Sequence, residues 1–291
     1  MPTRIAIIGP GAIGGSVAVW LAQSQGLEVT LCARTPFERL VVETPNGTIE
    51  AKPEILTQPA QANPFDWVLI ATKAYDASGT AAWLQALVGP TTQVAVLQNG
   101  VEHVARFAAV VPADRILPAI VDIPGERSAP GRIRQRRLGT IVVPDGPAGD
   151  AFVRLFAATP IAVATSDDFR TVAWTKLAFN CAGAISALVM KPGGVAWREG
   201  IADIQRAMVR ECVSVGRAEG AHLPEHLPDI VIDKYREAPR DSINSIHADR
   251  AAGRPMELDA RNGVIVRLGQ VHGIPTPINA TIVALLEAAA E

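Results

Sequence analysis

The chain has 291 residues, of which 48% are hydrophobic and 19% are charged, and its formal net charge is -2. This is an ordinary globular composition, long enough for one large or two medium domains. A charge so close to zero gives no reason to expect nucleic acid or an anionic membrane as a partner. No uninterrupted apolar run approaches the roughly 18 residues that a membrane-spanning helix needs.

The cysteines and histidines suggest neither a disulfide framework nor a metal site. Three cysteines are scattered along the chain: Cys32, Cys181 and Cys212. Their odd number favours reduced thiols and a cytoplasmic protein. His222 and His226 have the spacing of one helical turn, but Pro224 and Pro228 indicate a loop there. Because no third ligand lies nearby in the sequence, we expect no bound metal.

The first half of the chain alternates short apolar runs with helical segments. Runs bounded by Gly, Pro, Asp or Asn are predicted as strands buried on both faces: RIAIIG from Arg4, EVTLCAR from Glu28, DWVLIAT from Asp66, TQVAVLQNG from Thr92 and GTIVVP from Gly139. Segments 15–26 and 74–89 have helical spacing and end at glycine. This order predicts an α/β, Rossmann-like, doubly wound parallel sheet.

The pattern changes from about Ser166 onward. Long segments with helical spacing follow, and no convincing strand lies among them: 167–190, 200–220, 256–274 and 280–291. We therefore predict a Rossmann-like domain over 1–165 and an all-α domain over 166–291. The basic stretch SAPGRIRQRRLG, residues 128–139, is predicted as an exposed hairpin or loop.

A glycine-rich turn, GPGAIG, follows the first predicted strand and begins the first helix. An apolar stretch that follows Arg4 could also be an export signal, but Gly-Pro-Gly would break the helix that such a signal needs. In a dinucleotide fingerprint, Gly9 permits the tight turn, Gly11 lets the pyrophosphate approach the backbone, and Gly14 lets helix pack on strand. Ala12 and Ile13 then lie in the first helical turn, whose positive end favours phosphate. The alternative is that the glycines only turn the chain.

The end of the second predicted strand bears on which dinucleotide is bound. An NAD-binding chain usually places Asp or Glu there to hold the ribose hydroxyls. This chain has Cys32, Ala33 and then Arg34. A guanidinium with no competing carboxylate suits the 2′-phosphate of NADP. The alternative is an exposed surface arginine.

Polar residues follow two further strands, where ligands of an open parallel sheet bind. Lys73 ends one run, and Asn99 follows the other in the sequence LQNG. Each also has an ordinary interpretation, as a solvated lysine and as an Asn-Gly turn.

The helical half contains a lysine in an otherwise apolar helix. Lys176 and Asn180 lie four residues apart and therefore share one helix face. Such a lysine needs water, a partner or a function, and a lysine whose head reaches solvent is the simple alternative. Glu257 is predicted in the first turn of a new helix, and Ser245 on the helix before it.

These motifs together resemble the ketopantoate reductases, also called 2-dehydropantoate 2-reductases. The resemblance spans nearly the whole chain, in the family's order: the glycine loop, Arg34, TKAYD, LQNGVE, TKLAFNC and SINSIHADRAAGRPMELDARNG. It implies an enzyme of pantothenate and coenzyme A biosynthesis. That enzyme reduces the 2-keto acid 2-dehydropantoate to pantoate with hydride from NADPH, in some cases as a homodimer.

The resemblance also implies roles for individual residues. Lys176 would be the catalytic proton donor to the keto oxygen, and Glu257 would hold the substrate hydroxyl and the lysine. The positions matching substrate-binding residues are Asn99, Asn180 and Ser245. The positions expected at the cofactor are Gly9, Gly11, Ala12, Ile13, Gly14, Arg34, Lys73, Asn99 and Glu257.

Two departures from the family pattern concern the substrate. Ala184 stands where the family often has an asparagine, and segment 119–131 lacks the small, threonine-rich pattern of the family. A missing amide removes one substrate hydrogen bond or leaves room for another substrate. Two alternatives therefore stay open: a related reductase of a different 2-keto acid or ketone, and an NADP-sensing protein without catalysis.

Overall fold

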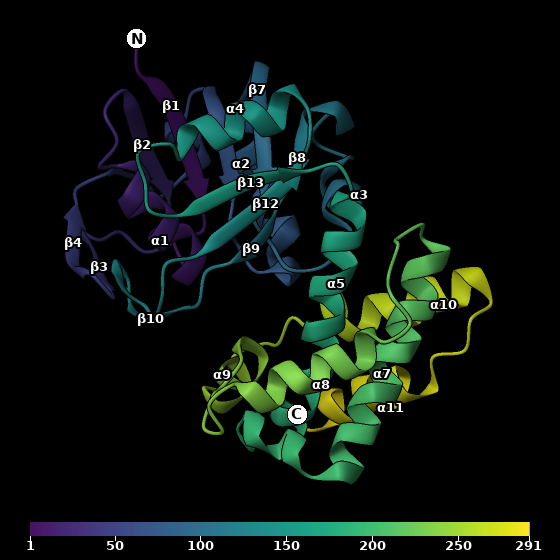
Figure 1. Cartoon of the computed structure of the whole chain (residues 1–291). Coiled ribbons are helices and arrows are strands. Elements are labelled where there is room, and N and C mark those ends of the chain that lie inside the picture. The colour runs from purple at the N-terminus through teal and green to yellow at the C-terminus, as the bar shows by residue number, and fades with distance from the viewer. Residues whose placement is uncertain (291) are drawn as a thin grey trace. The chain divides into compact units, whose positions relative to one another are not determined.

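The structure is a computed structural model, and it describes residues 1–290. The chain divides into two compact units, the first ending at Phe169 and the second beginning at Arg170. Figure 1 shows an α/β first unit and a helical second unit.

A six-stranded parallel sheet forms the centre of the first unit, with strand order β5-β2-β1-β6-β7-β8. Its strands are β1 (Thr3–Ile8), β2 (Leu27–Cys32), β5 (Glu54–Leu56), β6 (Phe65–Ile70), β7 (Val88–Val96) and β8 (Ile116–Pro118). The central order, with neighbouring strands joined by crossovers, is that of a Rossmann-like fold. The fold class predicted from the sequence is confirmed.

Both faces of this sheet are buried, as the continuous apolar runs predicted. Ile5 and Ile7 enter one core cluster, whereas Ala6 and Ile8 enter the other, because successive side chains of a strand point to opposite faces. The helices of this unit are α1 (Ala12–Leu21), α2 (Ala77–Leu87), α3 (His103–Phe107) and α4 (Pro147–Leu155), with 3-10 turns at Pro59–Gln61, Ala74–Asp76 and Ala113–Arg115. Helices α1 and α4 contribute to the first cluster, and α2 and α3 to the second.

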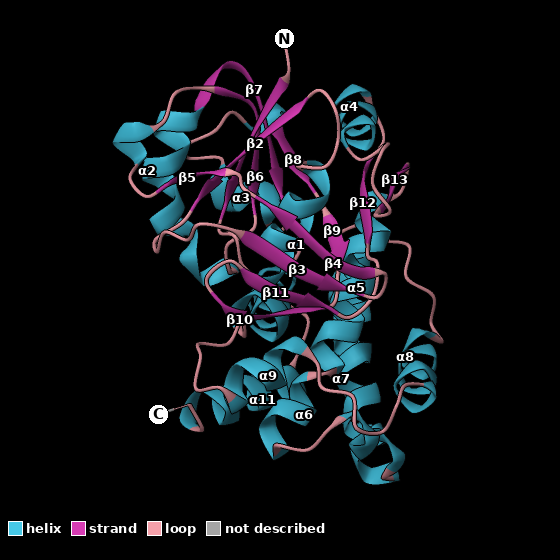
Figure 2. Ribbon diagram, turned by 90° about the vertical axis from the view of Figure 1, so that its left-hand side faces the viewer, coloured by secondary structure: helices cyan, strands magenta, loops and turns pink. Residues whose placement is uncertain are grey.

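A second, four-stranded sheet packs on α1 and was not predicted from the sequence (Figure 2). Its order is β10-β11-β3-β4, built from β10 (Gly125–Ala129), β11 (Arg132–Gln135), β3 (Leu40–Thr44) and β4 (Gly47–Ala51). Helix α1 is therefore covered on both sides, which explains why it is apolar around most of its circumference. The basic stretch at 128–139 lies largely on the antiparallel β10–β11 hairpin, with exposed arginines, which confirms that prediction.

The run GTIVVP is a strand, as predicted, but it lies outside the main sheet. It forms β12 (Thr140–Pro144), which pairs with β13 (Ala162–Ser166) in parallel and with β9 (Ile120–Asp122) in antiparallel orientation. The prediction of one parallel sheet containing this run is therefore wrong. Apolar composition reports burial, whereas sheet membership depends on long-range pairing that the composition does not record.

The second unit contains helices and no strand among residues 170–290. These helices are α5 (Phe169–Ala182), α6 (Ala184–Val189), α7 (Glu199–Ala218), α8 (Leu227–Glu237), α9 (Ser245–Ala251), α10 (Val264–His272) and α11 (Pro277–Ala288), with a 3-10 segment at Gly193–Trp197 and a π-helical segment at Asp259–Gly263. The helical stretch Phe169–Val189 is long and apolar enough to cross a membrane, because an 18-residue window within it has a mean hydropathy of 1.4. However, 61% of that window is buried inside the protein. It fits the core helix of this unit.

A buried polar network fixes the core of the second unit. Asn262 donates to the carbonyl oxygen of Cys181 at 3.3 Å and to Asn279 Oδ1 at 2.9 Å. Asn279 in turn donates to Glu211 Oε2 at 2.7 Å. Both asparagine side chains are fully buried. Because a buried amide without partners is costly, this network specifies how α5, α7, α11 and the π-helical segment meet.

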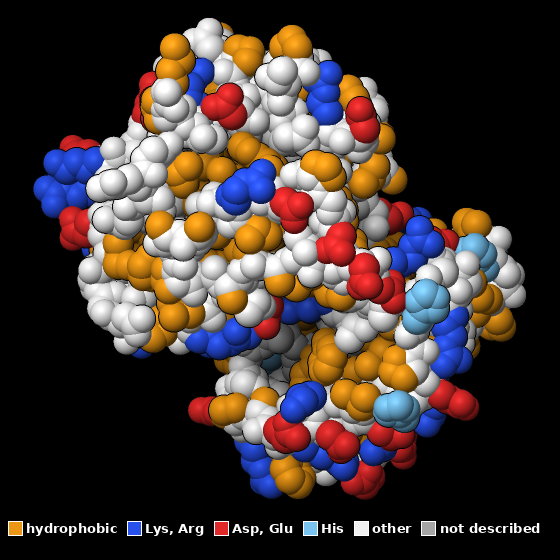
Figure 3. Space-filling model, turned by 45° about the horizontal axis from the view of Figure 1, so that its top comes forward, with side chains coloured by type: hydrophobic (Ala, Val, Ile, Leu, Met, Phe, Trp, Pro, Cys, Tyr) orange, Lys and Arg blue, Asp and Glu red, His pale blue; other side chains and the backbone are white. Residues whose placement is uncertain are grey.

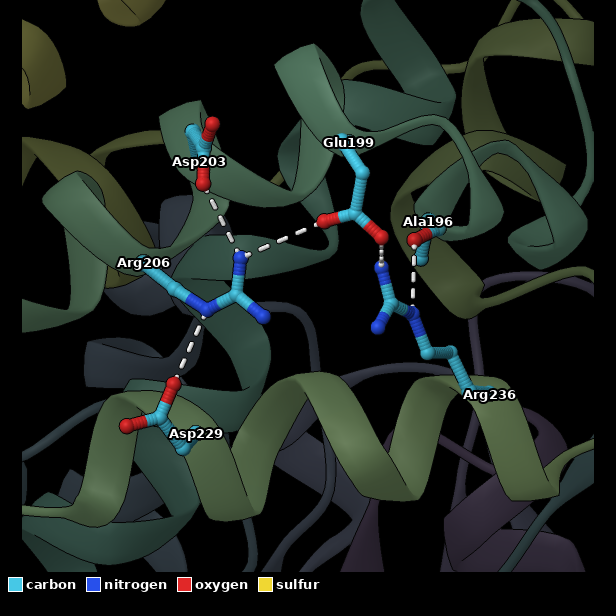
Figure 4. A network of polar contacts seen from close by, with 6 residues as sticks. All are labelled: Ala196, Glu199, Asp203, Arg206, Asp229 and Arg236. Carbon is cyan, nitrogen blue, oxygen red and sulfur yellow. Dashed lines mark hydrogen bonds and ion pairs between the residues drawn. The ribbon is translucent and has the colours of Figure 1, made fainter.

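An ion-pair network joins α7 to α8 nearer the surface (Figure 4). Arg206 lies 2.9 Å from Asp229, 3.0 Å from Asp203 and 3.8 Å from Glu199. Arg236 lies 2.7 Å from the other oxygen of Glu199. Shared partners reduce the side-chain entropy lost per pair, so the network stabilises the unit more than the same number of isolated surface pairs would.

On the face shown in Figure 3, basic side chains are interspersed with acidic ones.

Candidate active site

The glycine loop has the geometry that a phosphate-binding turn requires. Gly9 has φ +87°, and a Cβ there would come within 2.9 Å of the backbone nitrogen of Thr72. A Cβ on Gly14 would overlap the carbonyl oxygen of Gly9. By contrast, a Cβ on Gly11 would have no protein atom closer than 4.0 Å. Gly9 and Gly14 are therefore required by the fold, whereas the openness above Gly11 suits a ligand.

The amino end of α1 has the features of an anion-binding site. Gly11 is its N-cap without a side-chain hydrogen bond, and the first turn, which includes Ala12 and Ile13, contains no acidic residue. Backbone N–H groups and the positive end of the helix dipole therefore dominate the local field. This arrangement can hold a phosphate.

Arg34 lies just past β2 and reaches into solvent. Its side chain is 91% exposed, and its Nη2 is 3.8 Å from Asp76 Oδ2, a long and solvent-screened contact. The strand ends at Cys32, whose pKa burial and the charge of Glu54 raise to about 12. The thiol is therefore neutral, and neither Cys32 nor Ala33 brings a negative charge to the end of this strand.

Polar contacts join the carboxyl ends of β6 and β7. Gln98 donates from Nε2 to Thr72 Oγ1 at 2.9 Å and to the carbonyl oxygen of Lys73 at 3.3 Å. Its Oε1 accepts from Arg106 at 2.9 Å. Lys73 and Asn99, both half-buried, are thereby held on two neighbouring strand ends. The structure brings them to the edge of the sheet where the glycine loop lies.

His103 contacts the backbone at the same edge of the sheet. It is buried, its Nε2 is 2.9 Å from the carbonyl oxygen of Gln98, and desolvation lowers its pKa to about 4 against the opposing backbone hydrogen bond. The folded protein therefore holds His103 neutral, whereas the unfolded chain takes up a proton near pH 6.5. Stability contributed in this way is complete above about pH 6.5 and is lost as the pH falls toward 4.

We therefore expect the free energy of unfolding to fall by roughly 3 kcal/mol between pH 6.5 and pH 4 because of this residue. Urea unfolding at a series of pH values should show this loss, and His103→Gln should remove it because an amide does not titrate. A difference between wild type and His103→Gln that stays constant over this range would contradict a neutral buried histidine.

Helix α5 places Lys176 and Asn180 on one half-buried face, as their spacing predicted. Trp174 and Leu177, on another face of the helix, are buried. Their burial determines which face of α5 is turned toward the core. A lysine thus lies beside apolar packing, with an amide one turn further on. This pair can present an ammonium and an amide to one small polar molecule.

The junction between α5 and α6 anchors the start of α9. Asn244 donates to the carbonyl oxygen of Gly183 at 2.9 Å and to Ser186 Oγ at 3.0 Å, while its Oδ1 caps α9 by accepting from the backbone of His247 at 3.0 Å. Tyr235 donates to the carbonyl oxygen of Phe179 at 2.9 Å. The bonds of Asn244 hold the start of α9, with Ser245 as its first residue, at the junction of α5 and α6.

Glu257 and Arg261 complete this part of the second unit. Both side chains are buried, with exposed fractions of 5% and 3%. Arg261 donates from Nη2 to Ser245 Oγ at 2.6 Å. Desolvation lowers the pKa of Arg261, and the negative charge of Glu257 is the largest opposing influence. A carboxylate, a guanidinium and a hydroxyl therefore form one charged cluster.

One prediction about this segment is wrong, and several of its residues were not predicted. Glu257 lies in the loop before the π-helical segment instead of in a first helical turn. Sequence reasoning also missed Arg261, Asn244 and Tyr235. The sequence NSIH has the pattern of a helix N-cap and could have identified Asn244. Nothing in the spacing marked Arg261 as a neighbour of Ser245.

The predicted residues thus form two sets, each within one unit. The first unit carries the glycine loop, Arg34, Lys73 and Asn99, and the second carries the remaining four: Lys176, Asn180, Ser245 and Glu257. A cavity of about 470 Å³ lies elsewhere, near the amino-terminal parts of β2 and β5, where it is lined by Leu27, Thr30 and Glu54 among others. Because ligands of parallel sheets bind at carboxyl ends, this cavity is not at the site.

A Rossmann-like unit with a dinucleotide-binding type of glycine loop, followed by a helical unit, is the architecture of a class of two-domain dehydrogenases and reductases. The family model "Ketopantoate reductase PanE/ApbA" matches residues 5–148, and the model of its C-terminal part matches residues 168–290. The chain therefore belongs to the ketopantoate reductase family, as its motifs indicated.

Individual relatives cover the chain from end to end. It is 62% identical over 288 residues to a 2-dehydropantoate 2-reductase of Caulobacter vibrioides, covering 99% of both chains. A solved structure of a PanE/ApbA family ketopantoate reductase from Ralstonia eutropha has a TM-score of 0.91 at 33% identity and covers 99% of this chain and 98% of its own. A dimeric ketopantoate reductase from Staphylococcus aureus has a TM-score of 0.87 at 25% identity, covering 98% of each chain.

Proposed function

We propose that the chain is a 2-dehydropantoate 2-reductase, which reduces the keto group of 2-dehydropantoate to the hydroxyl of pantoate with NADPH. The full-length identity of 62% to the Caulobacter vibrioides reductase carries this proposal. It is supported by the lysine on α5 and by the charged cluster of the second unit. Residues 1–165 would bind the cofactor, and residues 166–291 would supply the proton donor.

The residues of the first unit fit NADPH. Gly11 leaves its backbone open, and the amino end of α1 offers N–H groups without a competing carboxylate. Arg34 is exposed and can pair with the 2′-phosphate through two N–H groups. Lys73 and Asn99 would hold the ring end of the cofactor at the strand ends. When bound, NADPH would supply the hydride to the keto carbon.

The second unit supplies the charge chemistry at the oxygen. Lys176 would donate a hydrogen bond and then a proton to the keto oxygen, which stabilises the developing alkoxide. Glu257 would hold the lysine and the hydroxyl of the substrate. Asn99, Asn180 and Ser245 would bind the remaining polar groups, with Ser245 as a donor to the carboxylate.

A related reductase of another 2-keto acid is the second candidate, and Ala184 favours it. This side chain is fully buried at the start of α6, where the family often has an asparagine. A methyl group offers no hydrogen bond to a substrate, so selectivity for ketopantoate rests on the other groups. An NADP sensor without catalysis would leave the buried charges of Glu257 and Arg261 without a function.

The test is NADPH oxidation, followed by absorbance, with ketopantoate and a panel of other 2-keto acids. Ketopantoate as the substrate with the highest kcat/KM is the expected result. A higher value for another keto acid would keep the mechanism and change the substrate. Tight NADPH binding with no turnover of any substrate would favour the sensor.

Arg34→Ala is expected to raise KM for NADPH by about 10- to 100-fold, because a charge-assisted pair with the 2′-phosphate is lost. KM for NADH should not change, because NADH lacks that phosphate. Arg39→Ala is the matched control, since Arg39 is also exposed and pairs with Glu50 at 3.4 Å. Equal effects of Arg34→Ala on both cofactors would argue against NADP selectivity through this residue.

We also propose a homodimer, as in the Staphylococcus aureus relative, and a cytoplasmic location, consistent with three buried, free cysteines. Sedimentation equilibrium should give twice the monomer mass, and a monomer at micromolar concentration would argue against the dimer.

A further inference from the structure

The buried guanidinium of Arg261 has no role in the proposed transfer of hydride and proton. Burial of a cation costs several kcal/mol, and arginine is retained at such positions when it is paired and hydrogen-bonded. Arg261 is 3% exposed, and its Nη2 donates to Ser245 Oγ at 2.6 Å. Its Nε is buried without a hydrogen-bond acceptor among the described residues. Among the described residues, the serine hydroxyl thus accepts a hydrogen bond from this cation.

The chemistry of the pair fixes the direction of the serine hydroxyl. Arginine has five donors and no acceptor, so Ser245 Oγ must be the acceptor of the 2.6 Å bond. The hydroxyl hydrogen then remains available for a different acceptor. Ser245 is exposed, so that acceptor can come from solvent or from a bound molecule. The positive charge behind Oγ also polarises the O–H bond and makes it a stronger donor.

We propose that Arg261 is a positioning residue that acts through Ser245, making this hydroxyl a dedicated donor to the carboxylate of the keto acid. The inference rests on the proposed function and deepens it, because it names the determinant of selectivity for an anionic substrate. The nearby charge of Glu257 balances the guanidinium, so the cluster stays close to neutral until the substrate carboxylate arrives. Arg261 itself does not need to touch the substrate.

The neutral lactone of the same keto acid is the discriminating probe, because it keeps the keto group and lacks the free carboxylate. It also lacks the free hydroxyl, which is assigned to Glu257 and not to Ser245. Arg261→Met should raise KM for ketopantoate by about 10- to 100-fold, the usual effect of losing a hydrogen bond to a charged group. The change in kcat should stay within about threefold, as expected for an interaction with ground state and transition state alike. KM for the lactone and for NADPH should be unchanged.

Two further variants separate positioning from simple structural support. Arg261→Lys keeps a cation and a donor and should recover part of the lost affinity for ketopantoate. In a Ser245→Ala background, Arg261→Met should have little further effect on KM for ketopantoate, because the arginine acts through that hydroxyl. Arg250→Met is the control: Arg250 is a partly buried arginine of the same helix as Ser245, and it donates to the carbonyl oxygens of Ala187 and Leu188.

Equal losses for the keto acid and the lactone, or additive losses in the double variant, would overturn the role of Arg261 while leaving the proposed function intact. A wild-type enzyme that reduces no 2-keto acid would overturn both. If Arg261→Met does not fold, as judged by circular dichroism, Arg261→Lys and Ser245→Ala decide the question by the same ratio of keto acid to lactone.

Discussion

Lys176→Ala is expected to lower kcat for the keto acid by about 1,000-fold, with KM for NADPH unchanged. A positioned general acid typically contributes 10²–10⁴-fold, and a cation at a developing alkoxide adds electrostatic stabilisation. Lys176 lies half-buried on α5, whereas its neighbours in the sequence, Trp174 and Leu177, are buried in the core. It shares a half-buried face with Asn180, and α5 contains no second lysine that could replace it.

The measurement is steady-state kinetics with ketopantoate, together with NADPH binding followed by fluorescence. Lys176→Arg separates charge from proton donation, because a guanidinium keeps the charge and does not give up its proton. It should keep KM for the keto acid near the wild-type value but recover little of kcat. Lys191→Ala is the control, since this lysine is exposed and lies outside the site. A kcat of Lys176→Ala within threefold of wild type would assign proton donation to another group.

Much of the fold could be predicted because each buried strand depends on local composition. The segments around Ile5, Val68 and Val94 are continuously apolar, since both faces of the central sheet are covered. The four-stranded sheet was missed because β4, GTIEA, carries exposed and polar residues that resemble a loop. The assignment of β12 failed for a different reason, because its pairing partners are set by the long-range path of the chain.

The candidate site was predictable where function depends on spacing within one element. The glycine turn and the pair Lys176 and Asn180 follow from local periodicity. Arg261 was not predictable, because its contact with Ser245 joins residues 16 apart across a loop and a π-helical segment. Glu257 was placed in a first helical turn because it follows Gly253 and Pro255, whereas the π-helical segment begins only at Asp259. The assigned roles of these residues stay predictions.

Two glycines of the loop should respond differently to the same added methyl group, because the fold constrains only one of them. Gly14→Ala should destabilise the protein by about 1–3 kcal/mol, the usual cost of overpacking. Its Cβ would overlap the carbonyl oxygen of Gly9 and lie 2.9 Å from the Cβ of Ala71. Gly11→Ala should change stability by less than about 1 kcal/mol, which is the difference between glycine and alanine at an N-cap.

Gly11→Ala, the variant expected to keep its stability, should be the one that loses affinity for NADPH. A methyl group on Gly11 would stand where the pyrophosphate approaches the backbone, so NADPH should bind about 10- to 100-fold more weakly. Urea unfolding and NADPH titration of both variants measure the two effects separately. Gly26→Ala is not a suitable control, because Gly26 has φ +80° and alanine would be strained there. Gly200 at the start of α7 is suitable, since a Cβ there would meet nothing within 4 Å. If Gly11→Ala binds NADPH as tightly as Gly200→Ala does, the pyrophosphate does not lie over this loop.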